Sequence, residues 1–277
     1  AIVYSANKFS SVKPETWSAS KCAPYLAKPK PSDNKYRRGV LGCVTGSKQY
    51  PGAALLTTSA ALSVGIGMVR YFGPEVVKRA VIQNRPEVVL QTGKVDAYLL
   101  GSGIPAKKSL LRKITMEMAN RTDLPKVLDA GALYLTGTSK SPTIITPHAG
   151  ELAELINVPA KEIDADPIKY ALEAAKQFKV TVLLKGNKTV IANADRVIQL
   201  PSAPTWLATA GTGDVLAGIL GSLIALNHQI ANHENLIEIG ATASFLHAKA
   251  AEESSDGPLN LKYVIDCIPK EVSKLIK

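Results

Sequence analysis

Residues 208–220 read ATAGTGDVLAGIL, in which two glycines and a threonine crowd against an aspartate before an apolar run begins at helical spacing. A helix that begins near Gly213 presents backbone N–H groups without intrahelical acceptors, together with a partial positive charge. Gly211 and Gly213 carry no Cβ, so a phosphate can approach this backbone closely. The stretch predicts an anion hole, held rigidly by the buried stripe of Val215, Leu216, Ile219, Leu220, Leu223 and Ile224.

Asp214 occupies the first turn of this helix, and two interpretations are open. A first-turn carboxylate stabilises a helix through its dipole by about 0.3–1 kcal/mol. A carboxylate beside an anion hole can also take the proton of a hydroxyl while a phosphoryl group arrives on the adjacent N–H groups. The stretch is neither a Walker A loop nor the dinucleotide G-x-G-x-x-G motif.

Strand-like and helix-like segments alternate outward from this stretch. Runs typical of strands are residues 39–46, 67–73, 87–92, 95–101, 126–130, 143–147 and 180–186, with two antiparallel strands within 187–200. Runs typical of helices are residues 50–67, 109–119, 149–156, 170–178, 213–226, 233–253 and 261–276. Continuous apolar strands between helices indicate an α/β fold with a mostly parallel sheet covered on both faces.

Composition narrows the class of protein. The chain has 277 residues, no continuous apolar run long enough for a membrane span, and a start, AIVYSANKFSSVKPETW, without the features of a signal peptide. A soluble, cytoplasmic protein with no membrane partner is therefore expected. Cys22, Cys43 and Cys267 lie far apart, which favours reduced thiols, and the four histidines show no H-E-x-x-H spacing.

The net charge of +10 attracts polyanions, which could be nucleic acid or a nucleotide, or else indicates only a solvated basic face. Aromatic residues make up 5% of the chain, and no basic run is interleaved with Phe or Tyr. Because single-stranded nucleic acids are usually held on aromatic stacking platforms, we expect no nucleic-acid partner.

Loops that follow strands are the expected ligand-binding sites of such a sheet, because ligands bind beyond the carboxyl ends of parallel strands. The candidate loops are GSKQYPGAA (46–54), GSGIP (101–105), TPHAGE (146–151), LKGNKT (184–189) and AGTGD (210–214). We expect these five loops to close around one large ligand.

In this order, the motifs KYRRG, GSKQYPGAA, LLGSGI, VLDAGAL, IITPHAGELAEL, VLLKGNKTVIA and LATAGTGDVLAGIL resemble the ADP/ATP-dependent NAD(P)H-hydrate dehydratases of the ribokinase-like superfamily. The resemblance runs from about residue 36 to residue 251. It implies a three-layer ribokinase-like fold in a single domain over residues 1–277, with residues 1–35 as an N-terminal extension and no additional epimerase domain.

The implied activity is repair of NADH or NADPH whose nicotinamide ring has been hydrated. Hydroxide is a poor leaving group, since the pKa of water is ~15.7, whereas phosphate, with a second pKa of about 6, leaves readily. Phosphorylation of the ring hydroxyl therefore activates the elimination, which would yield NAD(P)H, phosphate and AMP, or ADP if ATP is the donor. The implied cofactor is Mg²⁺, ADP is the expected donor, and the relatives suggest a homotetramer.

The resemblance also implies residue roles. Asp214 would be the base for the ring hydroxyl, and the N–H groups of Gly211, Thr212 and Gly213 would cradle the transferring phosphoryl group. Contacts to the adenine nucleotide would come from Lys185, Gly186, Asn187, Lys188, Thr189 and Gly213. The dinucleotide pocket would be lined by Ala53, Ala54, Gly103 and His148. Glu151 and Asp129 would act indirectly, around magnesium.

Each of these residues also has a plainer interpretation. His148 could cap a helix or be a half-buried imidazole, Lys185 and Lys188 could be solvated hairpin charges, and Gly103 could only turn the chain. Glu151 is also the first-turn acid that helix dipoles favour. The segments GSGIP, VLDAGAL and LPSAPTWLATAG depart from the family's usual G-P-G-L-G, D-A-D-A-L and T-G-N-P.

Two rival functions remain at this level. A kinase of a small alcohol, such as a thiazole or pyrimidine precursor of thiamine, shares the GTGD corner, although YPGAA and TPHAGE favour the dehydratases. A non-enzymatic nucleic-acid-binding protein is supported by the net charge alone. The Ala-rich segment 241–251 could serve a subunit contact or the core.

Overall fold

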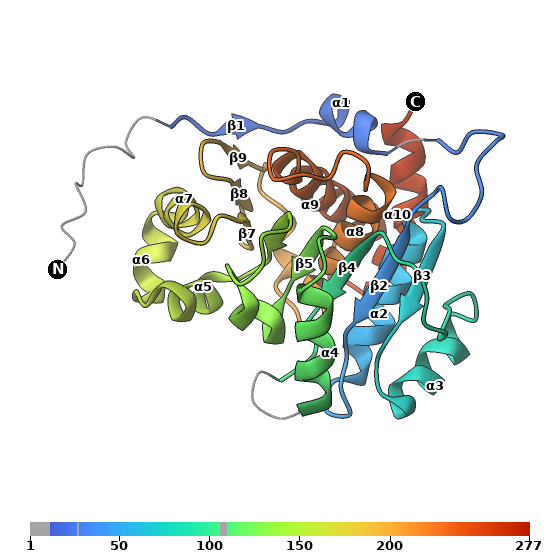
Figure 1. Cartoon of the computed structure of the whole chain (residues 1–277). Helices are drawn as coiled ribbons and strands as arrows, with labels where there is room; N and C mark the ends of the chain where they lie inside the picture. Colours follow the sequence, from blue (N-terminus) through green and yellow to red (C-terminus); the bar gives the residue numbers. More distant parts are fainter. Residues whose placement is uncertain (1–11, 27, 106–109) are drawn as a thin grey trace.

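The computed structural model describes residues 12–26, 28–105 and 110–277 (Figure 1). In these ranges nine strands form one sheet, in the order β1-β9-β8-β7-β6-β5-β4-β2-β3. The strands are β1 (Glu15–Thr16), β2 (Val40–Val44), β3 (Met68–Tyr71), β4 (Ala97–Leu100), β5 (Lys126–Leu128), β6 (Thr143–Ile145), β7 (Thr181–Leu184), β8 (Val190–Ala192) and β9 (Val197–Gln199). All neighbours are parallel except β7–β8 and β8–β9.

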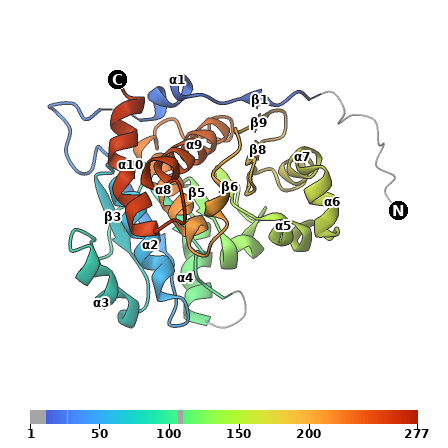
Figure 2. The same cartoon turned by 180° about the vertical axis from the view of Figure 1, so that it is seen from behind.

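Helices cover both faces of the sheet (Figures 1 and 2). The first core cluster includes residues of α1 (Ala19–Cys22), α2 (Pro51–Ser63), α3 (Glu75–Asn84), α8 (Thr212–Leu226), α9 (Leu236–Ser254) and α10 (Leu261–Leu275). The second includes residues of α4 (Leu110–Asn120), α5 (Ala149–Ile156), α6 (Ala160–Ala165) and α7 (Pro167–Phe178). The expected three-layer α/β fold is confirmed.

Strand residues divide between the two cores with a period of two. Leu99 belongs to the first cluster and Leu100 to the second, and Leu183 and Leu184 divide in the same way. Because successive side chains of a strand point to opposite faces, a strand covered on both sides must be apolar throughout. This is why the strands appear in the sequence as continuous apolar runs.

Helix α8 is fixed by its close approach to α2. A Cβ at Gly218 would lie 2.4 Å from the carbonyl oxygen of Thr57, so only glycine permits this separation of the helices. The side chains from Val215 to Ala225 are all buried. The N-terminal end of α8 is therefore mounted on a packed core and cannot shift independently of it.

The segment 87–92, expected as a strand, does not join the sheet beyond a single bridge between Arg70 and Val89. The guanidinium of Arg70 instead donates to the carbonyl oxygens of Gln91 at 2.6 Å and Lys94 at 3.2 Å. These bonds satisfy backbone groups that a ladder would otherwise pair. The helices α3 and α6 were not expected from the sequence.

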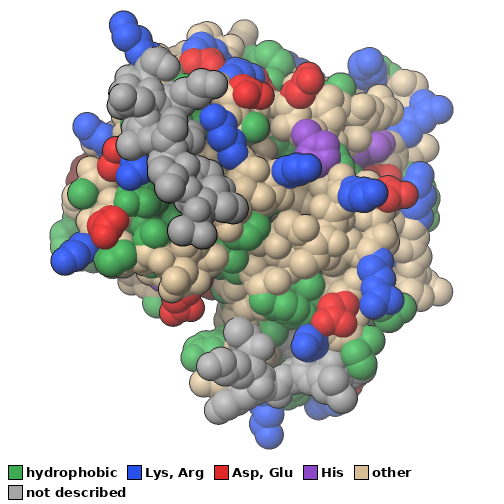
Figure 3. Space-filling model, turned by 60° about the vertical axis from the view of Figure 1, so that its left-hand side comes forward, with side chains coloured by type: hydrophobic (Ala, Val, Ile, Leu, Met, Phe, Trp, Pro, Cys, Tyr) green, Lys and Arg blue, Asp and Glu red, His purple; other side chains and the backbone are tan. Residues whose placement is uncertain are grey.

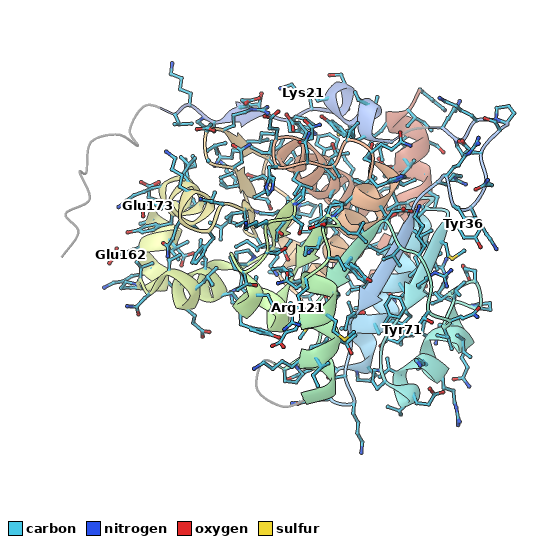
Figure 4. The ribbon with its side chains drawn as sticks, viewed as in Figure 1. Lys21, Tyr36, Tyr71, Arg121, Glu162 and Glu173 are labelled. Carbon is cyan, nitrogen blue, oxygen red and sulfur yellow. The ribbon has the colours of Figure 1, made fainter. Side chains whose placement is uncertain are left out.

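Residues 12–26 of the expected N-terminal extension pack against the domain. Strand β1 pairs with β9 at the sheet edge, and Glu15 accepts two hydrogen bonds from Arg196, at 2.9 and 3.1 Å. Trp17, Cys22 and Leu26 are buried. Figure 4 labels Lys21 on this segment, where its ammonium lies over the Trp17 ring. These described residues, which we call the strap, therefore extend the sheet and cover its first core.

Candidate active site

The N-terminal end of α8, residues 211–214, forms a wall shared by two cavities, and we call it the α8 tip. Gly211 is its N-cap, with φ +93°, a left-handed conformation that glycine adopts without strain. The Thr212 hydroxyl donates to the carbonyl oxygens of Leu207 and Thr209, which ties the tip to the preceding loop. As in any helix, the first-turn N–H groups have no intrahelical acceptor and can receive an anion.

The first cavity, of about 420 Å³, lies on the Gly213 side of this tip. It contains most of the residues that the sequence assigns to the nucleotide: Lys185, Gly186, Asn187, Thr189, Thr212 and Gly213. Lys188 is exposed and is not among the lining residues, so the plainer interpretation of a solvated hairpin charge fits it. The cavity's size is within the usual range of small-molecule pockets.

The second cavity, of about 540 Å³, lies on the Asp214 side. Ala53, Gly103, Gly211 and Asp214 line it together. A Cβ at Gly103 would lie 2.3 Å from the Cβ of Ala53, so these two small residues make room for each other. Ala54 is fully buried behind this wall, where it faces Gly46, and does not line the cavity as expected.

A cluster of charges lies under the tip of α8. The ammonium of Lys185 lies 3.1 Å from Asp129 and 3.7 Å from Glu151. Asp129 is buried and also accepts hydrogen bonds at 2.8 Å from the hydroxyls of Ser102 and Thr146. Lys185 is thus an ion-paired residue and not a solvated hairpin charge.

The charges of this cluster shift the pKa values of Lys185 and Asp214. Burial alone lowers the pKa of Lys185, but the charges of Asp129, Glu151 and Asp214 outweigh it, so that the pKa is raised. Burial, reinforced by the charge of Asp129, raises the pKa of Asp214 to about 7, although Lys185 opposes this shift. A carboxylate with a pKa near 7 is suited to general-base catalysis at neutral pH.

His148 has the helix-capping role that the sequence left open. It is the N-cap of α5, where its Nδ1 accepts from the backbone N–H of Glu151 at 3.2 Å. The Glu151 carboxylate in turn accepts from the backbone N–H of His148 at 2.8 Å. This capping box brings the TPHAGE loop beside Lys185, but His148 lines neither cavity.

Four further polar residues were not identified from the sequence. Ser102 and Thr146 hold Asp129. Thr146 directly follows β6 and Ser102 lies two residues beyond the end of β4, both inside motifs that were noted for other residues. Ser244 and His247 line the first cavity from α9, far along the chain from any motif. On a helix that is mostly buried, polar residues at helical spacing give no signal that separates them from core positions.

The described residues contain no group of three or more His, Cys, Asp and Glu placed to hold a metal ion. Mg²⁺, however, usually binds through one or two carboxylates together with substrate phosphates. Asp129 and Glu151 supply such oxygens beside the α8 tip, so their chemistry fits an ion brought in with a nucleotide. No helix in the described ranges is long and apolar enough to cross a bilayer.

Comparison with known proteins agrees with this geometry. Residues 41–270 match the NAD(P)H-hydrate dehydratase family. A bifunctional NAD(P)H-hydrate repair enzyme of Mycobacterium leprae is 36% identical over 253 residues, which cover 87% of this chain and 51% of that protein. An ADP-dependent (S)-NAD(P)H-hydrate dehydratase of Neisseria meningitidis is 32% identical over 83% of this chain and 82% of its own length.

Among solved structures, an ADP/ATP-dependent NAD(P)H-hydrate dehydratase of Bacillus subtilis, co-crystallized with ATP/Mg²⁺, superposes with a TM-score of 0.83 at 27% identity, covering 95% of this chain and 99% of the other. The chain spans about half the length of the bifunctional relatives that it matches. The family match and these likenesses agree on one conclusion: the chain belongs to the NAD(P)H-hydrate dehydratase family.

Proposed function

We propose that this protein dehydrates hydrated NADH or NADPH at the expense of an adenine nucleotide, with ADP as the donor. The observation that carries the proposal is the position of the α8 tip between two cavities, with Gly213 lining one and Asp214 lining the other. A nucleotide in the first cavity and a hydrated dinucleotide in the second would meet at this tip. Family membership supports the same substrates.

In the proposed reaction, Asp214 takes the proton of the ring hydroxyl, and the hydroxyl oxygen forms a bond to the terminal phosphorus of ADP. The bond from that phosphorus to the bridging oxygen breaks, and AMP leaves. The N–H groups of Thr212 and Gly213 stabilise the negative charge on the transferring group, because they are fixed before the reaction begins. The C–O bond of the phosphate ester then breaks and inorganic phosphate leaves with the bonding electrons. The neighbouring ring carbon loses a proton to the departing phosphate or to water, which restores the ring double bond.

Lys185 brings a positive charge to the same point. A Cβ built on Gly213 would lie 3.6 Å from its ammonium, so the lysine borders the space that a phosphate would enter. Asp129 and Glu151 orient this ammonium. A magnesium ion bound by the phosphates, with Asp129 and Glu151 acting on it indirectly, would supply further neutralisation of the phosphate charge.

The test is a turnover assay in which each possible phosphoryl donor is supplied separately. Hydrated NADH or NADPH is incubated with ADP, with ATP or without nucleotide, and the recovery of absorbance near 340 nm is followed together with free phosphate. ADP-dependent recovery with one phosphate released per NAD(P)H is the expected result. A stable phosphoester without released phosphate would identify a small-molecule kinase instead, and no recovery with either nucleotide would refute the proposal.

Three finer points belong to the same proposal. We place the protein in the cytoplasm, because its proposed substrates are soluble metabolites, and we propose that it is a homotetramer that uses Mg²⁺, as the resemblance of its motifs implies. The buried positions Ala241, Ala243, Ala250 and Ala251 contribute to the core of a single chain, so a subunit contact would need other surfaces. Light scattering of the purified protein measures the assembly.

A further inference from the structure

A further cavity, of about 280 Å³, lies between the strap and the domain, and we call it the strap cavity. Trp17, Ser18 and Ala19 of the strap line one side of it, and most of its other lining residues belong to α9 and to the segment 200–203. Four of its lining residues also line the first cavity: Thr189, Ala203, Ser244 and Ala248. A single layer of residues therefore separates the strap cavity from the proposed nucleotide site.

This shared wall is joined to the LKGNKT loop by hydrogen bonds. The backbone N–H of Ala203 donates to the carbonyl oxygen of Asn187 at 2.8 Å, and the side-chain amide of Asn187 donates to the carbonyl oxygen of Ala203 at 2.9 Å. The N–H of Leu200 donates to the carbonyl oxygen of Thr189, also at 2.9 Å. Asn187 and Thr189 both line the first cavity. A shift of the segment 200–203 would therefore move residues of the nucleotide site.

The strap is attached to the elements that frame the first cavity. In Figures 1 and 2 it runs past β9 and α9 to α10. Glu15 accepts from Arg196, which directly precedes β9, and the same guanidinium donates to Glu238 of α9. At the other end of the strap, the carbonyl oxygen of Tyr25 accepts from the side chain of Asn227, the C-cap of α8, at 3.0 Å. The docked strap thus fixes β9, α9 and α8 relative to one another.

We propose that Trp17 and the strap position the walls of the first cavity, so that full affinity for the donor nucleotide requires a docked strap. Trp17 is not among the described residues that line the first cavity, and it acts through α9 and the segment 200–203, so it is a positioning residue. This inference rests on the proposed function, since it takes the first cavity as the nucleotide site. Because coupling between two binding events is reciprocal, the nucleotide in turn stabilises the docked strap.

Calorimetry on the wild type and Trp17→Ala tests this role. The Kd of ADP should rise about ten-fold in the variant. The Kd of NADH should change little, because among the described residues the second cavity shares no lining residue with the strap cavity. In turnover, the KM for ADP should rise while kcat stays nearly constant. Trp17→Phe retains a buried ring and should restore most of the affinity for ADP.

Ile163→Ala is the matched control for a loss of stability. Ile163 is 1% exposed in the second core, and it lines none of the three cavities. Its substitution should lower the Tm to an extent comparable with Trp17→Ala, because both leave a cavity in a core, but the Kd of ADP should not change. An unchanged Kd of ADP in Trp17→Ala, or an equal loss of affinity in Ile163→Ala, would overturn the inference.

Hydrogen exchange of the wild type needs no substitution and keeps the inference testable if a variant fails to fold. ADP should slow the exchange of backbone amides in residues 12–26, whereas NADH should not, and identical exchange with and without ADP would contradict the role of the strap. A wild type that binds ADP without turnover would refute the proposed function alone, because binding and exchange still report on the strap. A wild type that binds neither ADP nor ATP would refute both.

Discussion

At the scale of single residues, Asp214 illustrates the conflict between stability and catalysis. Its pKa is about 7 in the folded protein and near the ordinary value of 3.8 in the unfolded chain. Between these values the folded state binds more protons, so the stability of the protein falls as the pH rises from about 4 to about 7. Asp214→Asn removes this cost. Its Tm should exceed that of the wild type at pH 8, and the difference should vanish below about pH 4.

The same substitution should abolish most of the activity. An amide cannot accept the hydroxyl proton, and loss of a general base costs typically 10²–10⁴-fold, so we expect turnover to fall by about 10³-fold. Binding of ADP, measured as a ligand-induced rise in Tm, should persist because Asp214 lines the other cavity. Activity within a few-fold of the wild type would remove Asp214 from the mechanism.

The pH profile should report the same carboxylate. Because the ionised form of Asp214 is the base, kcat/KM should fall about ten-fold per pH unit below about pH 7. The negative charge of Asp129 contributes to the raised pKa, so Asp129→Asn should move this limb to lower pH. Glu151→Gln also removes a partner of Lys185, but Glu151 is not among the charges that shift the pKa of Asp214. The acidic limb of the pH profile of this variant should therefore stay where it is in the wild type.

At the scale of elements, Gly211 at the N-cap of α8 and Gly213 and Gly218 within the helix have distinct roles. Gly211→Ala would place a Cβ 2.7 Å from Leu56 in a left-handed backbone, at an expected cost of about 1–2 kcal/mol. Gly218→Ala would collide with the Thr57 carbonyl and separate α8 from α2. Gly213→Ala meets only ordinary contacts, the nearest at 3.6 Å, and should not destabilise the helix.

Gly213→Ala should nevertheless weaken ADP binding, because its methyl group would occupy the space next to Lys185 that the phosphate needs. Urea unfolding and calorimetry on the three variants would test this division. The expected pattern is a stable Gly213→Ala with at least about ten-fold weaker binding of ADP, and two destabilised variants. A destabilised Gly213→Ala that still binds ADP normally would contradict it.

The elements also show what a sequence can reveal. The helix expected over 149–156 has these same bounds in α5, and α8 begins one residue before the expected Gly213. Local periodicity determines such segments. The structures of the strap and of the segment 87–92 depend instead on distant partners, such as Arg196 for Glu15 and Arg70 for Gln91. No local sequence pattern predicts these contacts.

In the candidate site, too, the sequence predicts some of the residues and misses others. Lys185 directly follows β7, and Gly213 and Asp214 lie in the first turn of α8. The topology of a parallel sheet predicts that such strand ends and helix starts meet. Ala54 follows Ala53 in the first turn of α2 but points into the core, which depends on a single step of helix geometry. Ser244 and His247 reach the first cavity only because α9 packs against α8, a tertiary contact that the sequence does not encode locally.

At the scale of the whole molecule, the net charge of +10 results from 33 Lys and Arg residues against 23 Asp and Glu residues. On the face that Figure 3 shows, Lys and Arg side chains are scattered and Asp and Glu lie among them. Charge dispersed as on this face raises the local concentration of anionic substrates, and it forms no continuous stripe there for a polymer.

The strap should contribute to the stability of the whole domain, and the chain's two tryptophans permit a matched test. Trp17 is 6% exposed against the first core and lies 6.3 Å from the ring of Tyr25, whereas Trp206 is 50% exposed. Trp17→Ala should lower the free energy of unfolding by about 3 kcal/mol, since it leaves a cavity between the strap and the core. Trp206→Ala should cost about 1 kcal/mol or less. Urea titrations followed by circular dichroism compare the two, and equal losses would mean that the strap is not an integral part of the core.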